Sequence, residues 1–264
     1  MIRCVPFIIA FPLLLLAYSD YDMDGVEDRF DACNATPFTD IVDATGCSIY
    51  SLESPHQFQA SLLLSYAQLD STTFKAKETI NTILSFDYTY RDFDFWTSMS
   101  HYTMDDEEGM NDTYVAVSYR FHPLQTVDLV GVAGVILPTY TPDLEGSATD
   151  MFATLEGDAY IDTLTLAGSL TYTWINDRDS DLQEFQNTLA FSLAAGYIWT
   201  PTLSTLLSYN YSDAIYTDMP ALQNSSLQLF YAFSSDISLL TYYAMGLSPN
   251  SSKHSLGLGI TYRF

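Results

Sequence analysis

Apolar and polar residues alternate along the last nine positions of the chain. Leu256, Leu258, Ile260, Tyr262 and Phe264 stand at every second position, with small or polar residues between them. Because successive side chains of a β-strand point to opposite sides, this spacing predicts a strand with one apolar face. Two settings suit such a strand: a wall between lipid and a polar lumen, or the edge of a soluble β-sandwich.

The same alternation recurs from Gln57 to the carboxyl terminus. We expect strands at residues 57–68, 78–91, 93–103, 112–122, 126–138, 150–160, 162–175, 184–199, 202–213, 224–234, 236–246 and 253–264. Each segment is long enough to cross a bilayer as a tilted strand. The alternation is less regular in 126–138 and 236–246, so strand counts of ten or fourteen stay open beside twelve.

The connections between these segments alternate between long and short. Long connections are expected at 69–77, 104–111, 139–149, 176–183, 214–223 and 247–252, and short ones at Asp92, Pro123, Ile161, Thr200, Pro201 and Ser235. Outer-membrane barrels combine short periplasmic turns with longer outer loops, whereas a soluble sandwich has no reason to alternate them. The sequence therefore predicts an all-β fold over residues 57–264, a transmembrane antiparallel up-and-down β-barrel of about twelve strands.

The last predicted strand, residues 253–264, also supports an outer-membrane β-barrel. In its residues at 256, 258, 260, 262 and 264 it resembles the closing strand of bacterial outer-membrane β-barrels. The resemblance implies that the barrel-assembly machinery reads the terminal aromatic, Phe264, and that outer-membrane lipids and lipopolysaccharide surround the wall. An even number of strands returns the chain to the side where the barrel began. Both barrel ends, and whatever precedes them, are thus expected in the periplasm.

Strand parity separates a lipid-facing side from a lumen side. The lumen set consists mainly of Ser, Thr, Ala and Gly, which leaves room for water and makes passage of small solutes plausible. Parity also directs seven charged residues inward near the periplasmic strand ends: Asp87, Arg91, Asp94, Arg120, Asp128, Glu156 and Asp158. This charge ring is either a constriction that sorts ions or a salt-bridged plug that closes the barrel.

The first residues of the chain have the pattern of a secretory signal. Arg3 precedes an apolar stretch from Val5 to Ala17, and small residues follow at the positions that a signal peptidase reads. We expect cleavage after Ser19, which removes Cys4 and leaves Cys33 and Cys47 in an oxidising compartment. An even pair in such a compartment is expected to form a disulfide, which would stabilise the segment by roughly 3 kcal/mol on the chain-entropy account.

An acidic segment follows the predicted cleavage site, over residues 20–50. Asp20, Asp22, Asp24, Asp28 and Asp31 occupy positions 1, 3, 5, 9 and 12 of a loop, with Gly25 at position 6 and the Val26 carbonyl at position 7. Hard oxygen ligands at this spacing are typical of a Ca²⁺ loop, and the glycine permits its sharp turn. The other interpretation is a solvated acidic linker.

The residues that follow this loop extend the similarity to calcium-binding modules. With Cys33, Thr36, Pro37, Val42, Asp43, Gly46 and Cys47, the segment resembles one thrombospondin type 3 repeat, a short Ca²⁺-binding module. The resemblance implies Ca²⁺ as the cofactor of a small periplasmic domain. The segment departs from the family in carrying Thr39 where glycine is usual, and in being a single repeat.

Composition narrows the function classes. The chain is 48% hydrophobic and 15% aromatic, which excludes a disordered protein, and its formal net charge of −24 excludes a nucleic-acid partner on electrostatic grounds. Much of the acidic excess lies in the calcium-type segment and in the long connections. We expect these carboxylates to concentrate cations at a pore mouth or to bridge to lipopolysaccharide through divalent ions.

Three functions are compatible with these observations. The first is an outer-membrane channel for passive passage of small cationic or neutral solutes. The second is a structural or adhesive barrel that tethers the envelope through Ca²⁺. The third is a lipid-modifying enzyme, for which His101 with Ser100 and Asn111 is the only candidate constellation and lacks a recognised spacing. We favour the channel and expect no catalytic residues.

Overall fold

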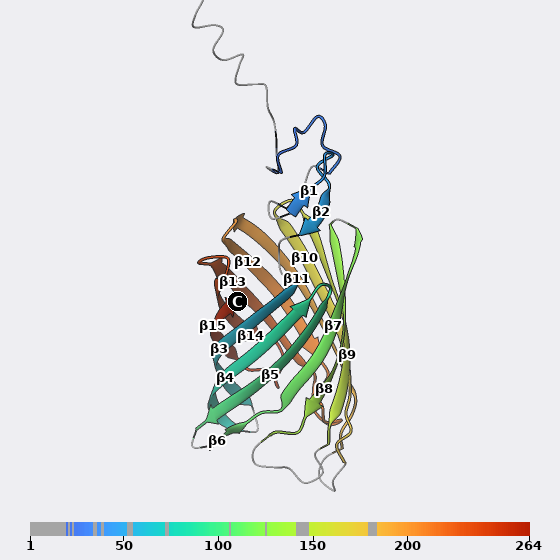
Figure 1. Ribbon diagram of the computed structural model, residues 1–264. Helices are drawn as coiled ribbons and strands as arrows, with labels where there is room; N and C mark the ends of the chain where they lie inside the picture. Colours follow the sequence, from blue (N-terminus) through green and yellow to red (C-terminus); the bar gives the residue numbers. More distant parts are fainter. Residues whose placement is uncertain are drawn as a thin grey trace, which may run out of the picture. The chain divides into compact units, whose positions relative to one another are not determined.

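The protein is described here by a computed structural model (Figure 1). It describes residues 20, 22, 24–33, 36–37, 40–51, 55–71, 74–105, 107–124, 126–140, 148–178 and 184–264. The predicted signal segment, residues 1–19, lies outside the described residues. Contacts divide the chain into two units, with the boundary between Pro55 and His56.

The first unit is small and built around its turns. Strand β1 (Asp40–Val42) pairs antiparallel with β2 (Ser48–Ser51), and the expected disulfide joins Cys33 to Cys47. The hydroxyl of the buried Thr36 donates to the Gly46 carbonyl at 2.6 Å. Asp31 accepts the Cys33 N–H at 2.8 Å. These bonds tie the acidic loop to the β1–β2 turn.

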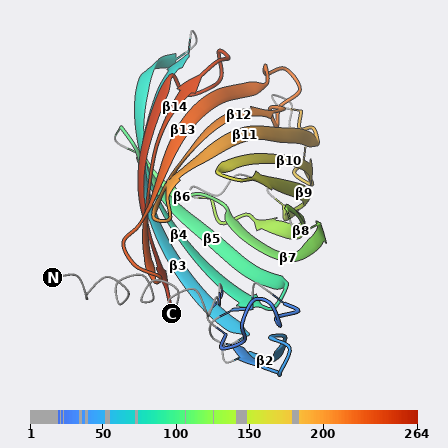
Figure 2. The ribbon, with the colours of Figure 1, turned by 90° about the horizontal axis from the view of Figure 1, so that it is seen from above.

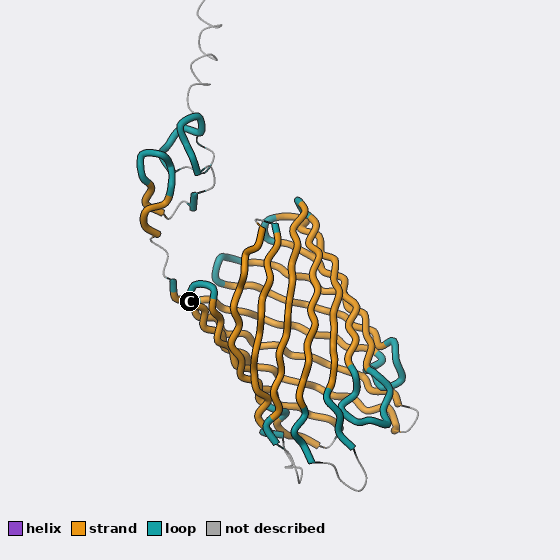
Figure 3. The backbone as a smooth tube through the Cα atoms, turned by 90° about the vertical axis from the view of Figure 1, so that its right-hand side faces the viewer, coloured by secondary structure: helices purple, strands orange, loops and turns teal. Residues whose placement is uncertain are grey.

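The second unit is a barrel of long antiparallel strands. They are β3 (His56–Ser71), β4 (Phe74–Tyr90), β5 (Phe93–Met104), β7 (Thr113–Leu124), β8 (Val127–Leu137), β9 (Asp150–Ile161), β10 (Leu164–Trp174), β11 (Thr188–Thr200), β12 (Leu203–Ser212), β13 (Leu222–Ala232), β14 (Ile237–Gly246) and β15 (His254–Arg263). A short strand, β6 (Glu107–Met110), pairs with the end of β5. Figure 3 shows the described loops gathered at the two ends of the strands.

Pairing of the last strand with the first closes the barrel. β15 runs antiparallel to β3, with Leu258 opposite Leu64, and the amides and carbonyls of Phe58 and Phe264 exchange two hydrogen bonds. Figure 2 shows the strands following one another around a ring. The predicted closed barrel of twelve strands is confirmed. Closure removes the unpaired strand edges that an open sheet would present.

The outer face of the barrel is apolar over most of its strands. Leu155, Leu193 and Leu207 are 56%, 61% and 58% exposed, and aromatic side chains such as Trp199 and Phe233 are exposed nearer the short turns. The residues between them point into the lumen and are mainly polar on β10 to β13. No helix among the described residues has the length and apolar character of a membrane span.

The predicted strands match the observed ones in number and order. Each predicted segment overlaps one observed barrel strand, and the ends differ by a few residues. The predicted alternation of connections is also present: tight turns such as Arg91–Asp92 occur at one end, and longer connections such as Asp213–Ala221 at the other. The chain enters and leaves the barrel at the short-turn end, because His56 pairs with Tyr90 beside the β4–β5 turn.

Candidate functional site

Strand register brings inward side chains of seven strands into one row across the barrel wall. The row runs, in order of pairing from β15 to β9, through Arg263, Gln59, Asp87, Trp96, Ala116, Gly134 and Phe152. Directly opposite residues of antiparallel strands have their Cβ atoms about 5 Å apart, so each member touches the next. A carboxylate, two aromatic rings and a guanidinium thereby line one arc of the lumen.

Two further rows lie on the short-turn side of the first. One contains Thr89, Asp94, Ser118, Val132 and Thr154, and the other Arg120, Val130 and Glu156. The three rows surround a cavity of about 660 Å³ within the lumen. Its lining is Gln57, Gln59, Asp87, Thr89, Arg91, Asp94, Trp96, Ser118, Arg120, Val130, Val132, Phe152, Thr154, Glu156, Asp158 and Arg263.

The structure brings the seven predicted charge-ring residues together. All of them except Asp128 line this cavity, and Asp128 lies beside it, with its Oδ2 atom 3.7 Å from Nη1 of Arg120. Asp128 also contacts His122, whose Nδ1 atom is 2.7 Å from Oδ1. Sequence parity missed the cavity residue Arg263, although it lies on the inward face of the closing strand.

Most of the cavity carboxylates form no salt bridge with a described residue. Asp94 accepts hydrogen bonds from the hydroxyls of Thr89 at 2.6 Å and Ser118 at 3.2 Å. Among the described residues, Asp87, Glu156 and Asp158 form no salt bridge. The guanidinium of Arg91 instead lies over the ring of Tyr90, at 5.4 Å from its centroid. The carboxylates thus remain available to a solute in the lumen.

This arc of the wall corrects the expectation of a lumen with few bulky residues. Trp96 and Phe152 pack against each other with ring centroids 6.2 Å apart, and Val130, Val132 and Phe152 form a buried apolar cluster with Ala116. Gly134 makes room for this packing, because a Cβ there would lie 2.5 Å from the Phe152 ring. The bulky side chains of this arc therefore pack on one another beside the cavity.

The opposite arc is formed by β10 to β14 and agrees with the sequence-based expectation. Its inward positions are mainly small and hydroxylated, and side chains pair across strands: Ser169 with Ser192 at 2.8 Å, Ser208 with Ser226 at 2.7 Å, and Asn210 with Asn224 at 2.9 Å. No described inward position on these strands is charged. The lumen is therefore two-sided, with a charged and aromatic arc facing a neutral polar one.

Aspartates fasten the loops at the other end of the barrel. Asp112, Asp150 and Asp177 accept the backbone N–H groups of Tyr140, Asn176 and Ala148 at 3.2, 2.7 and 2.7 Å. Burial, together with the charge of Asp177, raises the pKa of Asp112 above the ordinary 3.8. Burial, followed by the charge of Asp177, also raises the pKa of Tyr216. The carboxylates that hold these loops therefore repel one another.

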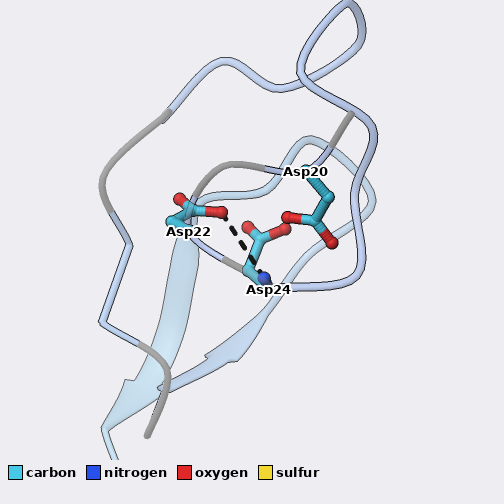
Figure 4. Close-up of side chains that lie close together, drawn as sticks. All are labelled: Asp20, Asp22 and Asp24. Carbon is cyan, nitrogen blue, oxygen red and sulfur yellow. Dashed lines mark hydrogen bonds between the residues drawn. The ribbon is translucent and has the colours of Figure 1, made fainter. Parts of the chain in front are cut away.

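Three of the predicted metal ligands converge in the first unit. Carboxylate oxygens of Asp20, Asp22 and Asp24 lie within 4.8 Å of one another (Figure 4). The backbone N–H groups of Gly25 and Val26 donate to Asp20 and Asp24 at 3.0 and 2.7 Å, which fixes the carboxylates on the loop.

Asp31 lies next to this group. Gly46 has a φ of 77°, and a Cβ at that position would meet the Asp31 carboxylate and lie 3.0 Å from Oδ2 of Asp24. The Oδ2 atoms of Asp24 and Asp31 are buried and accept no hydrogen bond from a described residue. Buried carboxylate oxygens without donors fit a hard cation such as Ca²⁺. Asp28 is not among the three converging carboxylates, and the Val26 carbonyl stays a predicted ligand.

The constellation considered for an enzyme does not assemble. Ser100 and His101 are consecutive residues of β5, so their side chains point to opposite faces of the wall. Asn111 donates to Ser100 at 2.8 Å and to Asn81 at 3.4 Å, which makes this group a polar contact within the lumen face. A nucleophile and its base need to share one hydrogen bond, and these residues do not.

Comparisons with known proteins give relatives in structure alone. No protein-family model and no curated protein matches the sequence. The barrel is similar to a solved outer membrane channel from Pseudomonas putida F1, with a TM-score of 0.66 and 13% identity over 84% of this chain and 100% of that one.

Two porins are also similar to this chain. The NanC porin has a TM-score of 0.59 at 14% identity, covering 77% of this chain and 98% of that one. The KdgM porin has a TM-score of 0.52 at 12% identity, covering 77% of this chain and 99% of that one. This chain shares the fold of these outer-membrane channels and porins.

Proposed function

We propose that the protein is a channel of the bacterial outer membrane, through which small cationic or neutral solutes pass passively. The apolar outer face supports a membrane location, because large side chains such as Leu193 and Leu207 are 61% and 58% exposed. Closed β-barrels satisfy every backbone group internally, which lipid requires of a spanning structure. The fold shared with outer-membrane channels supports the same location.

The loop lengths suggest an orientation for the barrel. In outer-membrane barrels the short turns face the periplasm and the longer loops face outward. On this rule His56 and Phe264, which lie at the short-turn end, belong to the periplasmic side. The amino-terminal unit then lies in the periplasm, and the acidic loops face lipopolysaccharide and its divalent ions.

The unpaired carboxylates of the lumen cavity carry the channel proposal. A salt-bridged plug would pair its charges, but the described inward ring contains one Arg–Asp pair, Arg120 with Asp128. Asp87, Glu156 and Asp158 face the cavity and form no salt bridge with a described residue, while Arg120 attracts Glu156 and Asp158 from a longer distance. Carboxylate rings of this kind favour cations over anions in pores. The arrangement therefore suits a constriction better than a plug.

Reversal potentials in planar bilayers test this function. The purified protein, held in a KCl gradient, is expected to conduct and to prefer K⁺ over Cl⁻. Changing Glu156→Gln together with Asp158→Asn should lower the K⁺/Cl⁻ permeability ratio at least twofold, because it removes two lumen charges. The control Asp236→Asn alters an exposed turn residue and should leave the ratio unchanged. Protein that inserts without conducting would overturn the channel proposal.

We also propose that the amino-terminal unit binds Ca²⁺ through Asp20, Asp22, Asp24 and Asp31. The convergence of the first three carboxylates and the buried oxygens of Asp24 and Asp31 support this assignment. A bound cation would offset the repulsion among these charges, so it would stabilise the disulfide-closed unit.

Isothermal titration of the oxidised full-length protein in detergent measures this binding. We expect saturable Ca²⁺ binding that Asp24→Asn weakens at least tenfold, because that residue contributes to the converging group. Glu27→Gln is the matched control, since Glu27 pairs with Arg29 at 2.7 Å. Absence of saturable heat at millimolar Ca²⁺ would contradict the proposal.

A further inference from the structure

The lumen cavity contains an aromatic pair that ion selectivity alone does not require. Trp96 and Phe152 come from β5 and β9, and only Ala116 and Gly134 separate them along their shared row. Both rings belong to the cavity lining. Phe152 is buried, at 8% exposure, so the half-buried Trp96 offers most of the aromatic surface to the cavity.

Carboxylates border this surface on two sides. Asp87 is the direct cross-strand neighbour of Trp96, and Asp94 is two residues from Trp96 on the same face of β5. Glu156 lies four residues from Phe152 on the same face of β9. Asp87 and Glu156 make no salt bridge with a described residue, so both can receive an ammonium group.

The guanidinium groups of the cavity are placed differently. Arg120 contacts Asp128, and Arg91 lies in the β4–β5 turn over the ring of Tyr90. Arg263, the last residue of β15, belongs to the same row as Asp87 and is separated from it by Gln59. The part of the cavity around Trp96 is therefore anionic, and an anionic solute would meet Asp87 next to the ring.

From this geometry we propose that the cavity is a binding site for small organic cations with a flat apolar body, such as arylalkylammonium ions. The inference rests on the proposed channel and names its solute class. The ammonium group lies at Asp87 or Glu156, and the body stacks on Trp96, next to Phe152. Cation–π attraction to the tryptophan adds to the carboxylate attraction. A cavity of about 660 Å³ lies within the usual range for small-molecule sites, roughly 300–1,000 Å³.

Intrinsic fluorescence measures this binding without reference to conduction. The chain has three tryptophans, so Trp174→Phe with Trp199→Phe leaves Trp96 as the sole reporter. This protein, folded in detergent, is titrated with benzylammonium, benzyl alcohol and benzoate. We expect saturable changes with benzylammonium, and at least tenfold weaker binding of the neutral and anionic compounds.

Two substitutions distinguish benzylammonium binding in the cavity from binding at the protein surface. Asp87→Asn is expected to weaken benzylammonium binding about tenfold, a loss of about 1.4 kcal/mol. Asp162→Asn, in an exposed turn with a φ of 55° that asparagine tolerates, should not change it. Equal binding of all three compounds, or binding unaffected by Asp87→Asn, would overturn the proposal. Barrel folding is checked by circular dichroism for each variant.

Block of K⁺ current in planar bilayers relates the site to the channel. Benzylammonium should interrupt the current, and Trp96→Leu should raise the blocking concentration about tenfold, whereas Trp199→Leu on the outer face should not. If benzylammonium binds by fluorescence but the protein conducts no KCl, the channel proposal is overturned and the binding-site proposal stands. If the protein conducts KCl but does not bind benzylammonium selectively, the binding-site proposal is overturned and the channel proposal stands.

Discussion

Gly134 decides where the ring of Phe152 lies. A Cβ at this position would be 2.5 Å from the ring and 2.7 Å from the backbone oxygen of Val115, so the ring occupies space that only glycine leaves. Gly257 hosts the ring of Tyr242 in the same way on β15. Aromatic side chains thus lie along the wall and not across the lumen.

Gly134→Ala is therefore expected to destabilise the barrel by about 1–3 kcal/mol, because Phe152 must leave its position or the strands must shift. Guanidinium unfolding in detergent measures the change. Gly168→Ala is the matched control, since a Cβ there would meet its nearest side chain, Leu193, at an ordinary 3.6 Å. Equal stability of the two variants would show that the ring moves freely.

At this scale the sequence predicted the inward charges but not the aromatic pair. Period-2 alternation assigns Asp87, Glu156 and Asp158 to the lumen, and the structure agrees. The contact between Trp96 and Phe152 depends on the registers of β5, β7, β8 and β9 together. Alternation within one strand carries no information on those registers, so the pair became visible only in the fold.

At the scale of elements, the sequence predicted the twelve barrel strands but not the short strand β6. Strand β6 contains Glu107 and Glu108, and this acidic composition is typical of a loop. Backbone pairing with His101–Met104 of β5 nevertheless makes it a strand, because the hydrogen bonds do not depend on the side chains. Strands β3 and β4 likewise extend beyond their predicted ends.

The loop-fastening aspartates give the barrel a pH dependence at its long-loop end. Burial and the charge of Asp177 raise the pKa of Asp112 above the ordinary 3.8, so folding favours its protonated form. The stabilising contribution is complete below 3.8 and is lost as the pH rises through the raised value. Asp112→Asn should therefore stabilise the protein at pH 7, because the amide oxygen can still accept the Tyr140 N–H.

Guanidinium unfolding at pH 7 and at successively lower pH checks this expectation. The difference in unfolding free energy between Asp112→Asn and the wild type should shrink as the pH falls through the raised pKa. Asp105→Asn removes a charge at the same end of the barrel, between β5 and β6, whereas Asp112 lies between β6 and β7, and it should show no such trend. A constant difference across the pH range would count against the role of Asp112.

At the scale of the whole molecule, closure depends on the terminal residue. Phe264 exchanges two backbone hydrogen bonds with Phe58 on the first strand and stacks on it with ring centroids 6.0 Å apart. The barrel is thus completed at the position where the resemblance to outer-membrane barrels implies recognition by the assembly machinery. We expect that removing the side chain affects assembly more than the finished fold.

Phe264→Ala should accordingly lower the amount of folded barrel in the membrane of living cells severalfold. Heat-modifiable migration on gels measures that amount, and refolding into detergent should remain near wild type. Phe233→Ala is the control, because Phe233 is similarly exposed, 61% against 64%, but lies in a turn between strands. Equal losses for the two variants would indicate a general need for aromatic side chains at this end.

The two-sided wall also determines the direction of the electric field inside the barrel. Fixed charges lie on the arc from β15 through β3 to β9, and β10 to β14 carry hydroxyls and amides. Field lines therefore cross the lumen from one wall to the other, in addition to running along its axis. On the proposed channel function, a dipolar solute in this stretch would turn its positive end to one side of the barrel, and so would pass in a preferred rotation as well as a preferred charge state.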